Sequence, residues 1–282
     1  MADYSNGEAR ALTMSTGSPR VLITGASSGI GAALAGEYAR RGARLLLLAR
    51  RTELLSQIAA RLRQGGAEVA IQTADVTHDG DVARAIASWS GEQGIDLVIA
   101  NAGFSVAGTL AQLTLADYRR QFETNVFGLL RTVYESLPAL RAARGRLAIM
   151  GSVAGHVAAP GASAYAMSKF ATRALADSLR AELGREGIGV TLISPAYVDS
   201  DIRRTDNRGA LHASAPDPIP AWLRMRAPRA ARHMADAIGR GRDEVVVTLH
   251  GKLIVFLARH FHRTVRAVTR RIGWRREPRS RN

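Results

Sequence analysis

The sequence of 282 residues contains no cysteine. Disulfides, thiolate metal sites and a cysteine nucleophile are therefore excluded, and a reducing compartment such as the cytoplasm is expected. No apolar run approaches the roughly 20 residues that a membrane-spanning helix needs. The seven histidines lack the spacing of a metal site, so we expect no bound metal. Residues 1–18 are small and polar, which predicts a flexible segment rather than a signal peptide or an anchor.

Lysine is scarce, because only two of the 39 basic residues are lysines, Lys169 and Lys252. The formal net charge is +15, and residues 251–282 carry ten basic residues against one acid, Glu277. The rest of the chain is only mildly basic, so any case for an anionic partner concerns this tail. Nucleic acid is not expected as that partner, because no aromatic interleaving or base-reading motif accompanies the charge.

Short apolar runs alternate with amphipathic helical stretches along most of the chain. Most runs are apolar throughout, which is typical of parallel strands covered on both faces. The pattern predicts an α/β fold over residues 19–250, a single doubly wound, Rossmann-like parallel sheet with helices on both faces. The expected strands are Val21–Thr24, Leu45–Ala49, Val69–Thr73, Leu97–Ala100, Arg146–Met150, Val190–Ile193 and Val245–Leu249. The expected helices are Ala32–Arg41, Glu53–Gln64, Asp79–Ser90, Leu115–Leu140, Ala164–Gly184 and Ala230–Arg240.

Residues 201–228 interrupt this alternation. They contain Pro216, Pro218, Pro220 and Pro228, which exclude a long regular helix and predict a loop or lid. We expect this loop to determine substrate specificity, so the sequence indicates no particular substrate.

The tail, residues 251–282, has a helical period that predicts one basic amphipathic helix. Its apolar stripe would lie on an anionic membrane surface, at the inner face of a membrane, or would pack on its own domain or a partner subunit. The stripe consists of Ile254, Leu257, Phe261, Val265, Val268 and Ile272, opposite Arg259, Arg263, Arg266 and Arg270.

A glycine-rich turn joins the first expected strand to the first helix. Glycines let the backbone approach a phosphate closely, and the helix N-terminus offers free N–H groups to a pyrophosphate. This predicts a dinucleotide site, with an ordinary tight turn as the alternative. The turn reads Thr24-Gly25-Ala26-Ser27-Ser28-Gly29-Ile30-Gly31.

The end of the second strand favours NADP(H) as the cofactor. NAD-binding folds usually carry an acid at this place, whereas an arginine suits the additional phosphate of NADP. Here the strand runs into Ala49-Arg50-Arg51, with no acid before Glu53. The alternative is that these are two more surface arginines.

Several further motifs occur in order along the chain. Tyr165-Ala166-Met167-Ser168-Lys169 follows Ser152, Asn125 lies in Thr124-Asn125-Val126, and Asp75 lies in Ala74-Asp75-Val76. With the glycine turn and Ala100-Asn101-Ala102-Gly103, they make the sequence resemble the classical short-chain dehydrogenase/reductase family over nearly all of residues 20–249. That family transfers hydride between a nicotinamide cofactor and a carbonyl or alcohol. Two residues depart from its motifs, Ala100 for an asparagine and Ala196 for a glycine.

Tyr165 and Lys169 are four residues apart and share one helix face. A free tyrosine, with a pKa near 10, is a poor proton donor or acceptor at neutral pH. A nearby cation stabilises the phenolate and lowers this pKa, and lysine acts there as a compact point charge. Taken alone, the pair could equally be an ordinary surface pair on a helix.

The resemblance implies the roles of the site residues. Tyr165 is expected to be the acid/base, Lys169 its pKa modulator and a ribose ligand, Ser152 the residue that orients the substrate, and Asn125 the anchor of a proton relay. The expected cofactor-binding residues are Thr24, Gly25, Ser27, Ser28, Gly29, Ile30, Gly31, Arg50, Asp75, Val76, Asn101, Ala102, Gly103, Tyr165, Lys169, Pro195, Val198 and Ser200. We therefore expect an NADP(H)-dependent oxidoreductase, as a homodimer or homotetramer, that reduces a ketone or aldehyde of lipophilic character. The alternative is a non-catalytic NADP(H)-binding or membrane-associated interaction protein on the same fold.

Overall fold

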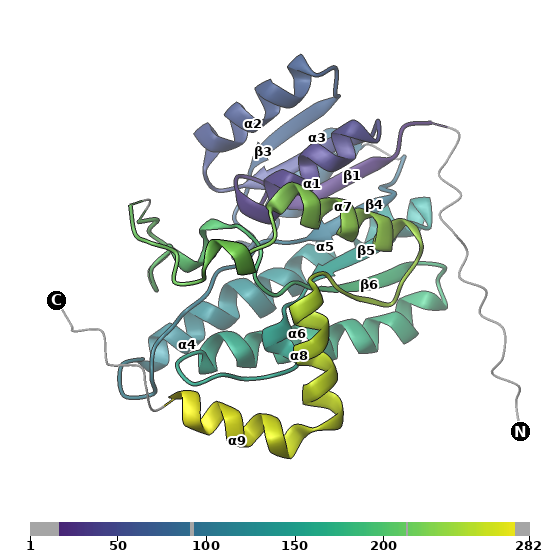
Figure 1. Cartoon of the computed structure of the whole chain (residues 1–282). Helices are drawn as coiled ribbons and strands as arrows, with labels where there is room; N and C mark the ends of the chain where they lie inside the picture. The colour runs from purple at the N-terminus through teal and green to yellow at the C-terminus, as the bar shows by residue number, and fades with distance from the viewer. Residues whose placement is uncertain (1–16, 91–92, 213, 274–282) are drawn as a thin grey trace, which may run out of the picture.

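The computed structural model of the chain describes residues 17–90, 93–212 and 214–273 (Figure 1). Within these ranges seven strands form one parallel sheet in the order β3-β2-β1-β4-β5-β6-β7. Successive strands are added on one side of β1 up to β3 and on its other side from β4 onward, so β1 pairs with both β2 and β4. This confirms the predicted doubly wound, Rossmann-like fold. The strands are β1 Arg20–Thr24, β2 Arg44–Ala49, β3 Val69–Thr73, β4 Leu97–Ala100, β5 Arg146–Met150, β6 Gly189–Ser194 and β7 Glu244–Val246. The predicted N-terminal segment lies outside the described residues, apart from residues 17 and 18.

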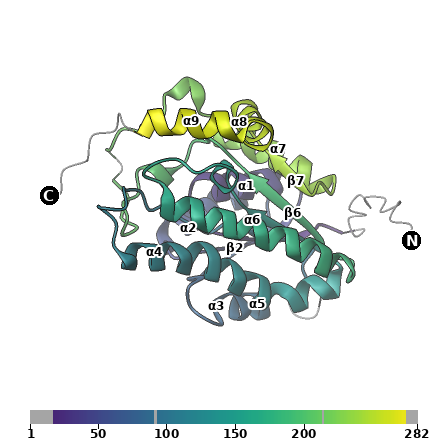
Figure 2. The same cartoon turned by 90° about the horizontal axis from the view of Figure 1, so that it is seen from below.

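Helices cover both faces of the sheet, as Figure 2 shows. Side chains from α1, α2 and α7 form one buried cluster against the sheet, and side chains from α3, α5 and α6 form the other. Successive residues of a strand point to opposite faces, so Leu45 and Leu47 enter the first cluster while Leu46 and Leu48 enter the second. The long helices are α1 Gly29–Arg40, α2 Thr52–Gln64, α3 Asp81–Ser90, α4 Leu115–Phe122, α5 Gly128–Ala143, α6 Ser163–Gly184, α7 Ala227–Gly239, α8 Leu249–His260 and α9 His262–Gly273.

The stretch predicted as one helix over Leu115–Leu140 contains a π-helical turn. The turn, η1 Glu123–Phe127, separates α4 from α5 without ending the helical path. Such a turn adds a residue to the helix and is frequent at functional sites. It carries Asn125, one of the predicted site residues.

The predicted bounds of the last strand are wrong. β7 ends at Val246 rather than at Leu249, because the Thr248 side chain accepts a hydrogen bond from the N–H of Gly251 at 3.1 Å and starts α8. The start of α7 differs as well, since Pro228 lies inside its first turn, where a proline is tolerated. The remaining loop contains the short 3-10 helices η3 Asp201–Arg203 and η4 Ala221–Leu223.

The tail forms two helices rather than the single helix predicted. α8 ends at His260 and α9 begins at His262, so Phe261 lies at a break and the predicted stripe is not continuous. On α8 the buried residues are Gly251 and Val255, which were not part of that stripe. Among the described residues no helix is long and apolar enough to cross a membrane. Trp274 and the residues after it lie outside the described part.

Candidate active site

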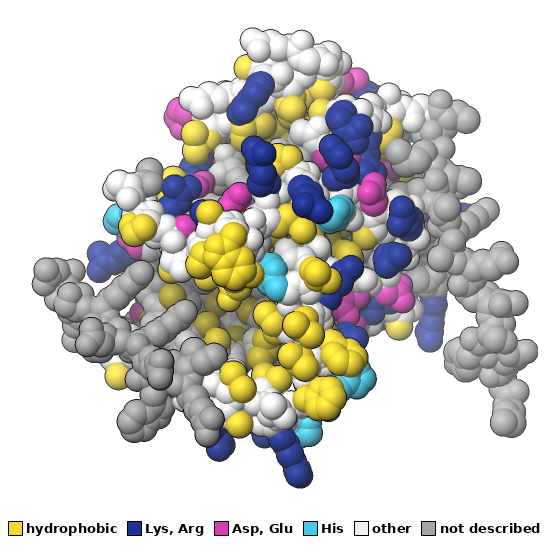
Figure 3. Space-filling model, in the orientation of Figure 1, with side chains coloured by type: hydrophobic (Ala, Val, Ile, Leu, Met, Phe, Trp, Pro, Cys, Tyr) yellow, Lys and Arg dark blue, Asp and Glu magenta, His cyan; other side chains and the backbone are white. Residues whose placement is uncertain are grey.

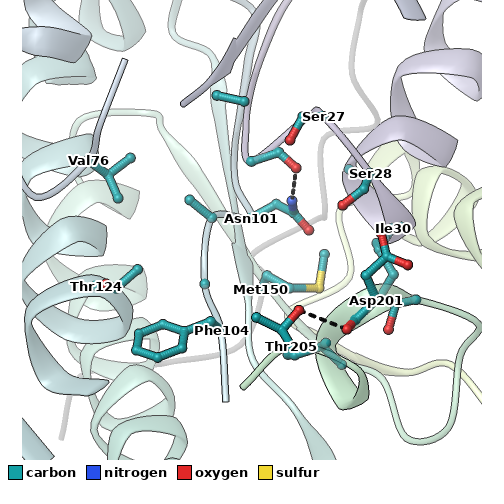
Figure 4. A pocket seen from close by; sticks show the side chains of 18 of the residues that line it. Ser27, Ser28, Ile30, Val76, Asn101, Phe104, Thr124, Met150, Asp201 and Thr205 are labelled. Atoms are coloured by element: carbon teal, nitrogen blue, oxygen red, sulfur yellow. Dashed lines mark hydrogen bonds between the residues drawn. The ribbon is translucent and has the colours of Figure 1, made fainter. Parts of the chain in front are cut away.

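A pocket opens at the carboxyl edge of the sheet, where loops from distant parts of the sequence meet beside the reversal of strand order. Figure 4 shows Ser27, Ser28 and Ile30 on one side of it and Val76 and Phe104 on the other. Every predicted site residue lines this pocket except Thr24 and Asn125, which form the hydrogen bonds described below. Those in the lining are Gly25, Ser27, Ser28, Gly29, Ile30, Gly31, Arg50, Asp75, Val76, Asn101, Ala102, Gly103, Ser152, Tyr165, Lys169, Pro195, Val198 and Ser200.

The glycine turn forms a cradle that side chains would fill. Gly25 and Gly29 have φ values of +67° and +54°, which glycine adopts readily and other residues rarely do. A Cβ on Gly31 would lie 2.3 Å from the carbonyl oxygen of Gly25, and one on Gly29 would lie 3.1 Å from the Cβ of Ser200. No side chain caps the N-terminus of α1. Its free N–H groups therefore face open space of the kind that a pyrophosphate fills, so these residues fit a dinucleotide.

Thr24 and Asn101 fasten this cradle to the loop after β4. The Thr24 hydroxyl oxygen accepts hydrogen bonds from the N–H groups of Asn101 and Ala102, both at 3.1 Å. In return, Asn101 Nδ2 donates to the carbonyl oxygens of Thr24 at 2.9 Å and Gly25 at 3.2 Å. Both side chains are thus engaged with the protein, and their geometry is that of residues that hold the turn in position.

Two arginines lie where β2 ends. Arg51 Nη2 donates to the hydroxyl of Ser28 at 2.6 Å and to that of Ser27 at 3.1 Å, so its guanidinium lies against the cradle. Arg50 is also exposed and reaches Asp75 Oδ2 at 3.5 Å. Both line the pocket. The sequence interpretation selected Arg50, whereas the structure adds Arg51 as a cation in direct contact with the loop.

Tyr165 lies near the start of α6 with its phenol hydrogen-bonded to the Ser152 side chain. Ser152 is the second residue after β5 and caps the 3-10 helix η2 Val153–Gly155, accepting from the N–H of Ala154 at 3.1 Å. Burial raises the pKa of Tyr165, and the bond to Ser152 and the charge of Arg203 oppose this rise. The protein without cofactor therefore raises the pKa of Tyr165, whereas the sequence led us to expect a lowered one.

Lys169 lies one turn further along α6 and is buried. Its Nζ donates to the carbonyl oxygen of Met150 at 2.7 Å and lies 5.8 Å from the centroid of the Tyr165 ring. Burial lowers the pKa of Lys169 to about 8. The amino group lies in the pocket lining and still holds its proton for the most part at neutral pH.

Asn125 joins the loop after β4 to α6. Its Oδ1 accepts from the N–H of Phe104 at 3.1 Å, and its Nδ2 donates to the Phe104 carbonyl oxygen at 3.0 Å and to Ser168 Oγ at 3.2 Å. With its side chain fully engaged, Asn125 positions these two segments relative to each other. The π-turn brings this side chain into the interior, where it is 2% exposed.

Some lining residues carry no sequence motif and were missed. Phe104, Met150 and Ile202 add apolar surface, and Arg203 adds a charge beside the phenol. Arg203 is held by Asp217, 2.7 Å away, within the proline-rich loop. Such an ion pair between two loop positions leaves no pattern in the sequence that could have indicated it.

The arrangement can bind a dinucleotide and move a proton beside it. The cradle and the two arginines would hold the phosphates, while Ser152 and Tyr165 place two hydroxyl groups at the other end of the same pocket. A carbonyl oxygen between these hydroxyls would receive two hydrogen bonds, which stabilise negative charge as it develops.

Known proteins carry the same architecture and motifs. The family model for short chain dehydrogenases matches residues 19–210. A curated relative, 11-beta-hydroxysteroid dehydrogenase A from Arachis hypogaea, is 41% identical over 188 residues, which are 65% of this chain and 53% of that protein. This chain belongs to the short chain dehydrogenase family.

Solved structures agree with the fold. A short-chain dehydrogenase from Sphingobium yanoikuyae, in complex with NADPH, is 28% identical with a TM-score of 0.71, covering 94% of this chain and 99% of that one. A family member from Burkholderia phymatum, in complex with NAD, has a TM-score of 0.75 at 24% identity, covering 94% and 98%. The similar structures thus include complexes with both nucleotides. The chain spans about half the length of the curated hydroxysteroid dehydrogenases that it matches.

Proposed function

We propose that the protein is an NADPH-dependent reductase of ketones or aldehydes with an apolar body. The observation that carries this proposal is the meeting of Ser152, Tyr165 and Lys169 with the glycine cradle in one pocket. Apolar lining from Phe104 and Met150 supports a lipophilic substrate. The name of the Arachis hypogaea relative, a hydroxysteroid dehydrogenase, supports the same class.

The preference for NADP(H) rests on Arg50 and Arg51. A 2′-phosphate beside the end of β2 would meet two guanidinium groups, and charge-assisted bonds to phosphate are among the strongest that a protein forms. No acid follows β2 before Glu53 to bind the ribose hydroxyls in the manner of NAD-binding folds.

In the proposed reduction, each residue has a role that follows from its position in the pocket. The nicotinamide ring, when bound, supplies the hydride. Ser152 holds the substrate oxygen beside the phenol, and Tyr165 donates its proton to that oxygen as negative charge develops there. Lys169 would bind the ribose of the cofactor through its Nζ and support the phenolate left behind. Asn125 holds the loop after β4 against α6, so the pocket wall and the catalytic helix keep their spacing.

The experiment is turnover of a panel of ketones and aldehydes with NADPH, comparing the wild type with Tyr165→Phe. We expect the variant to lose about 100-fold or more in kcat and to retain NADPH affinity, because only the transferable proton is removed. Tyr134→Phe is the matched control, because Tyr134 lies on α5 outside the pocket lining and the variant keeps its ring. Retained activity in Tyr165→Phe would exclude the assigned role. NADPH binding without turnover of any panel member, or of the corresponding alcohols with NADP⁺, would favour a non-catalytic NADP(H)-binding protein.

We also propose a homodimer or homotetramer. The support is a group of exposed apolar side chains that do not line the pocket: Phe127 on η1, Tyr134 on α5, and Met167 and Phe170 on α6.

A further inference from the structure

Helix α8 presents apolar side chains toward solvent as well as toward the protein. Gly251 and Val255 are buried against the domain. Five large apolar residues are exposed, with exposed fractions between 36% and 82%, and we call them the outer apolar face. They are Leu249, Leu253, Phe256 and Leu257 on α8, and Phe261 at the break before α9.

The outer apolar face is a continuous stripe. Leu249, Leu253 and Leu257 are spaced by four residues, Phe256 lies three after Leu253, and all four are on the side of α8 opposite Val255. Figure 3 shows apolar side chains gathered over the region that α8 occupies in Figure 1, with basic side chains at the lower edge, where α9 lies. Soluble monomers seldom expose a patch of this kind unless it contacts another surface.

Helices α8 and α9 carry basic residues and no acid. Arg263, Arg266 and Arg270 share one side of α9, turned away from Val265 and Val268. Lys252 on α8 is exposed, and the sequence contains no acid between Glu244 and Glu277. Arg259 pairs with Glu244 at 2.9 Å, and no ion pair of Arg263, Arg266 or Arg270 occurs within the described residues.

This combination favours an anionic bilayer over a second copy of the chain. In a symmetric dimer the same patch meets itself, so the arginines of one subunit would face those of the other and repel them. A bilayer with anionic headgroups accepts both features at once, because apolar side chains enter the acyl boundary while arginines remain among the phosphates. We propose that the outer apolar face and α9 dock the protein on an anionic lipid membrane.

Docking would also bring the pocket close to the lipid. Gly251 lies against Ala196, since a Cβ added to Gly251 would be 3.0 Å from that of Ala196, a residue of the pocket lining. The His250 ring stacks on Tyr197 with centroids 5.4 Å apart. In Figure 2, α8, α9 and the green loop that follows β6 lie along the same side of the molecule. An apolar carbonyl compound could then pass from the bilayer to the pocket; this step rests on the proposed reductase function, whereas the docking does not.

The test is sedimentation of the full chain with vesicles of phosphatidylcholine alone or mixed in equal parts with phosphatidylglycerol, without substrate. We expect binding to the anionic vesicles that weakens with salt. Arg263→Gln/Arg266→Gln/Arg270→Gln should reduce this partition on the order of 100-fold at low salt, about fivefold for each arginine. Leu253→Gln/Phe256→Gln should remove the part of the binding that persists in high salt.

Matched controls change the same residue types elsewhere. Arg61→Gln/Arg119→Gln/Arg185→Gln removes three exposed arginines, and Leu110→Gln/Leu115→Gln removes two exposed leucines that lie outside the tail. Equal losses in test and control variants would overturn the proposal, as would absence of wild-type binding at low salt or equal binding to both vesicle types. If Leu253→Gln/Phe256→Gln lowers the oligomer mass in lipid-free solution, a second copy covers this face and the proposal fails. Reduction of a soluble carbonyl compound, measured in parallel, tests the proposed reductase function separately.

Discussion

At the scale of single residues, Lys169 combines a functional position with a cost in stability. Its ammonium is buried with one hydrogen bond, from Nζ to the Met150 carbonyl oxygen, and burial lowers its pKa from 10.5 to about 8. Between these two values the unfolded chain holds the proton and the folded chain does not. Folding is therefore penalised fully below pH 8, and the penalty disappears as pH rises to 10.5.

We accordingly expect Lys169→Met to stabilise the cofactor-free protein while reducing turnover and cofactor binding. The gain at pH 7 should be ~1–3 kcal/mol, once the lost hydrogen bond is subtracted from the relieved burial cost, and it should shrink toward pH 10.5. Urea denaturation at pH 7 and pH 10 measures both values. Lys252→Met, which changes the other lysine at an exposed position, should leave stability nearly unchanged.

Arg50 and Arg51 provide a second prediction at this scale. Arg50→Ala and Arg51→Ala should each weaken NADPH binding by ~1.5–3 kcal/mol, the size of a charge-assisted hydrogen bond, and should affect NADH little. Arg51→Ala should also loosen the cradle slightly, because it loses its bonds to Ser27 and Ser28. Fluorescence titration of each variant with NADPH and with NADH measures the two affinities. Equal losses for NADPH and NADH would mean that neither guanidinium meets the 2′-phosphate.

At the scale of elements, the strands and the glycine turn could be predicted from the sequence, because both depend on a local pattern of residues. The apolar runs are strands because alternate residues enter the two buried clusters, and the glycine turn is where Gly25 and Gly29 require positive φ values. The π-turn was not predictable, because Glu123–Phe127 reads as ordinary helix and its extra residue reflects the packing of Asn125. The two-helix tail was missed because the apolar spacing runs through the break at Phe261, and the inward side of α8 is set by the packing of Gly251 and Val255.

The link between η2, β7 and α8 was also invisible in the sequence. His156, next to η2, lies with Nε2 3.0 Å from Glu244 Oε1 and 3.1 Å from Ser194 Oγ. Glu244 at the start of β7 also pairs with Arg259 of α8. The hydrogen bond with His156 lowers the pKa of Glu244 to about 2. The tail is thus attached to the element that Ser152 caps.

We expect Glu244→Gln to destabilise the protein by ~1–3 kcal/mol at neutral pH. The range extends down to the lower value because the carboxylate is partly exposed and solvent screens its interactions. A carboxyl with a lowered pKa stabilises the fold above its ordinary value of 4.5, and this contribution is lost as pH falls from 4.5 toward 2. The difference between variant and wild type should narrow across that window in thermal denaturation. Glu186→Gln, which breaks an exposed pair with Arg141, should destabilise the protein much less than Glu244→Gln does. A difference that does not vary with pH would contradict the assignment.

At the scale of the whole molecule, two apolar surfaces lie on different elements. The outer apolar face lies on α8 and at Phe261, next in the chain to the arginines of α9, while the group formed by Phe127, Tyr134, Met167 and Phe170 lies on η1, α5 and α6. Figure 2 shows α5 and α6 side by side. Two such surfaces allow the protein to assemble through one and to contact a membrane through the other.

The assembly itself can be tested on the second surface. A symmetric pair would bring the α5 and α6 side chains of one subunit against the same side chains of its partner, burying apolar area on both. Tyr134→Glu/Phe170→Glu would place like charges at the centre of that contact, so we expect the mass in solution to fall from that of a dimer or tetramer to a smaller species. Light scattering after gel filtration measures this. The matched control is Leu110→Glu/Leu115→Glu, which charges two exposed leucines outside these helices and should leave the mass unchanged. If Tyr134→Glu/Phe170→Glu retains the wild-type mass while remaining folded, the subunits meet through a different surface.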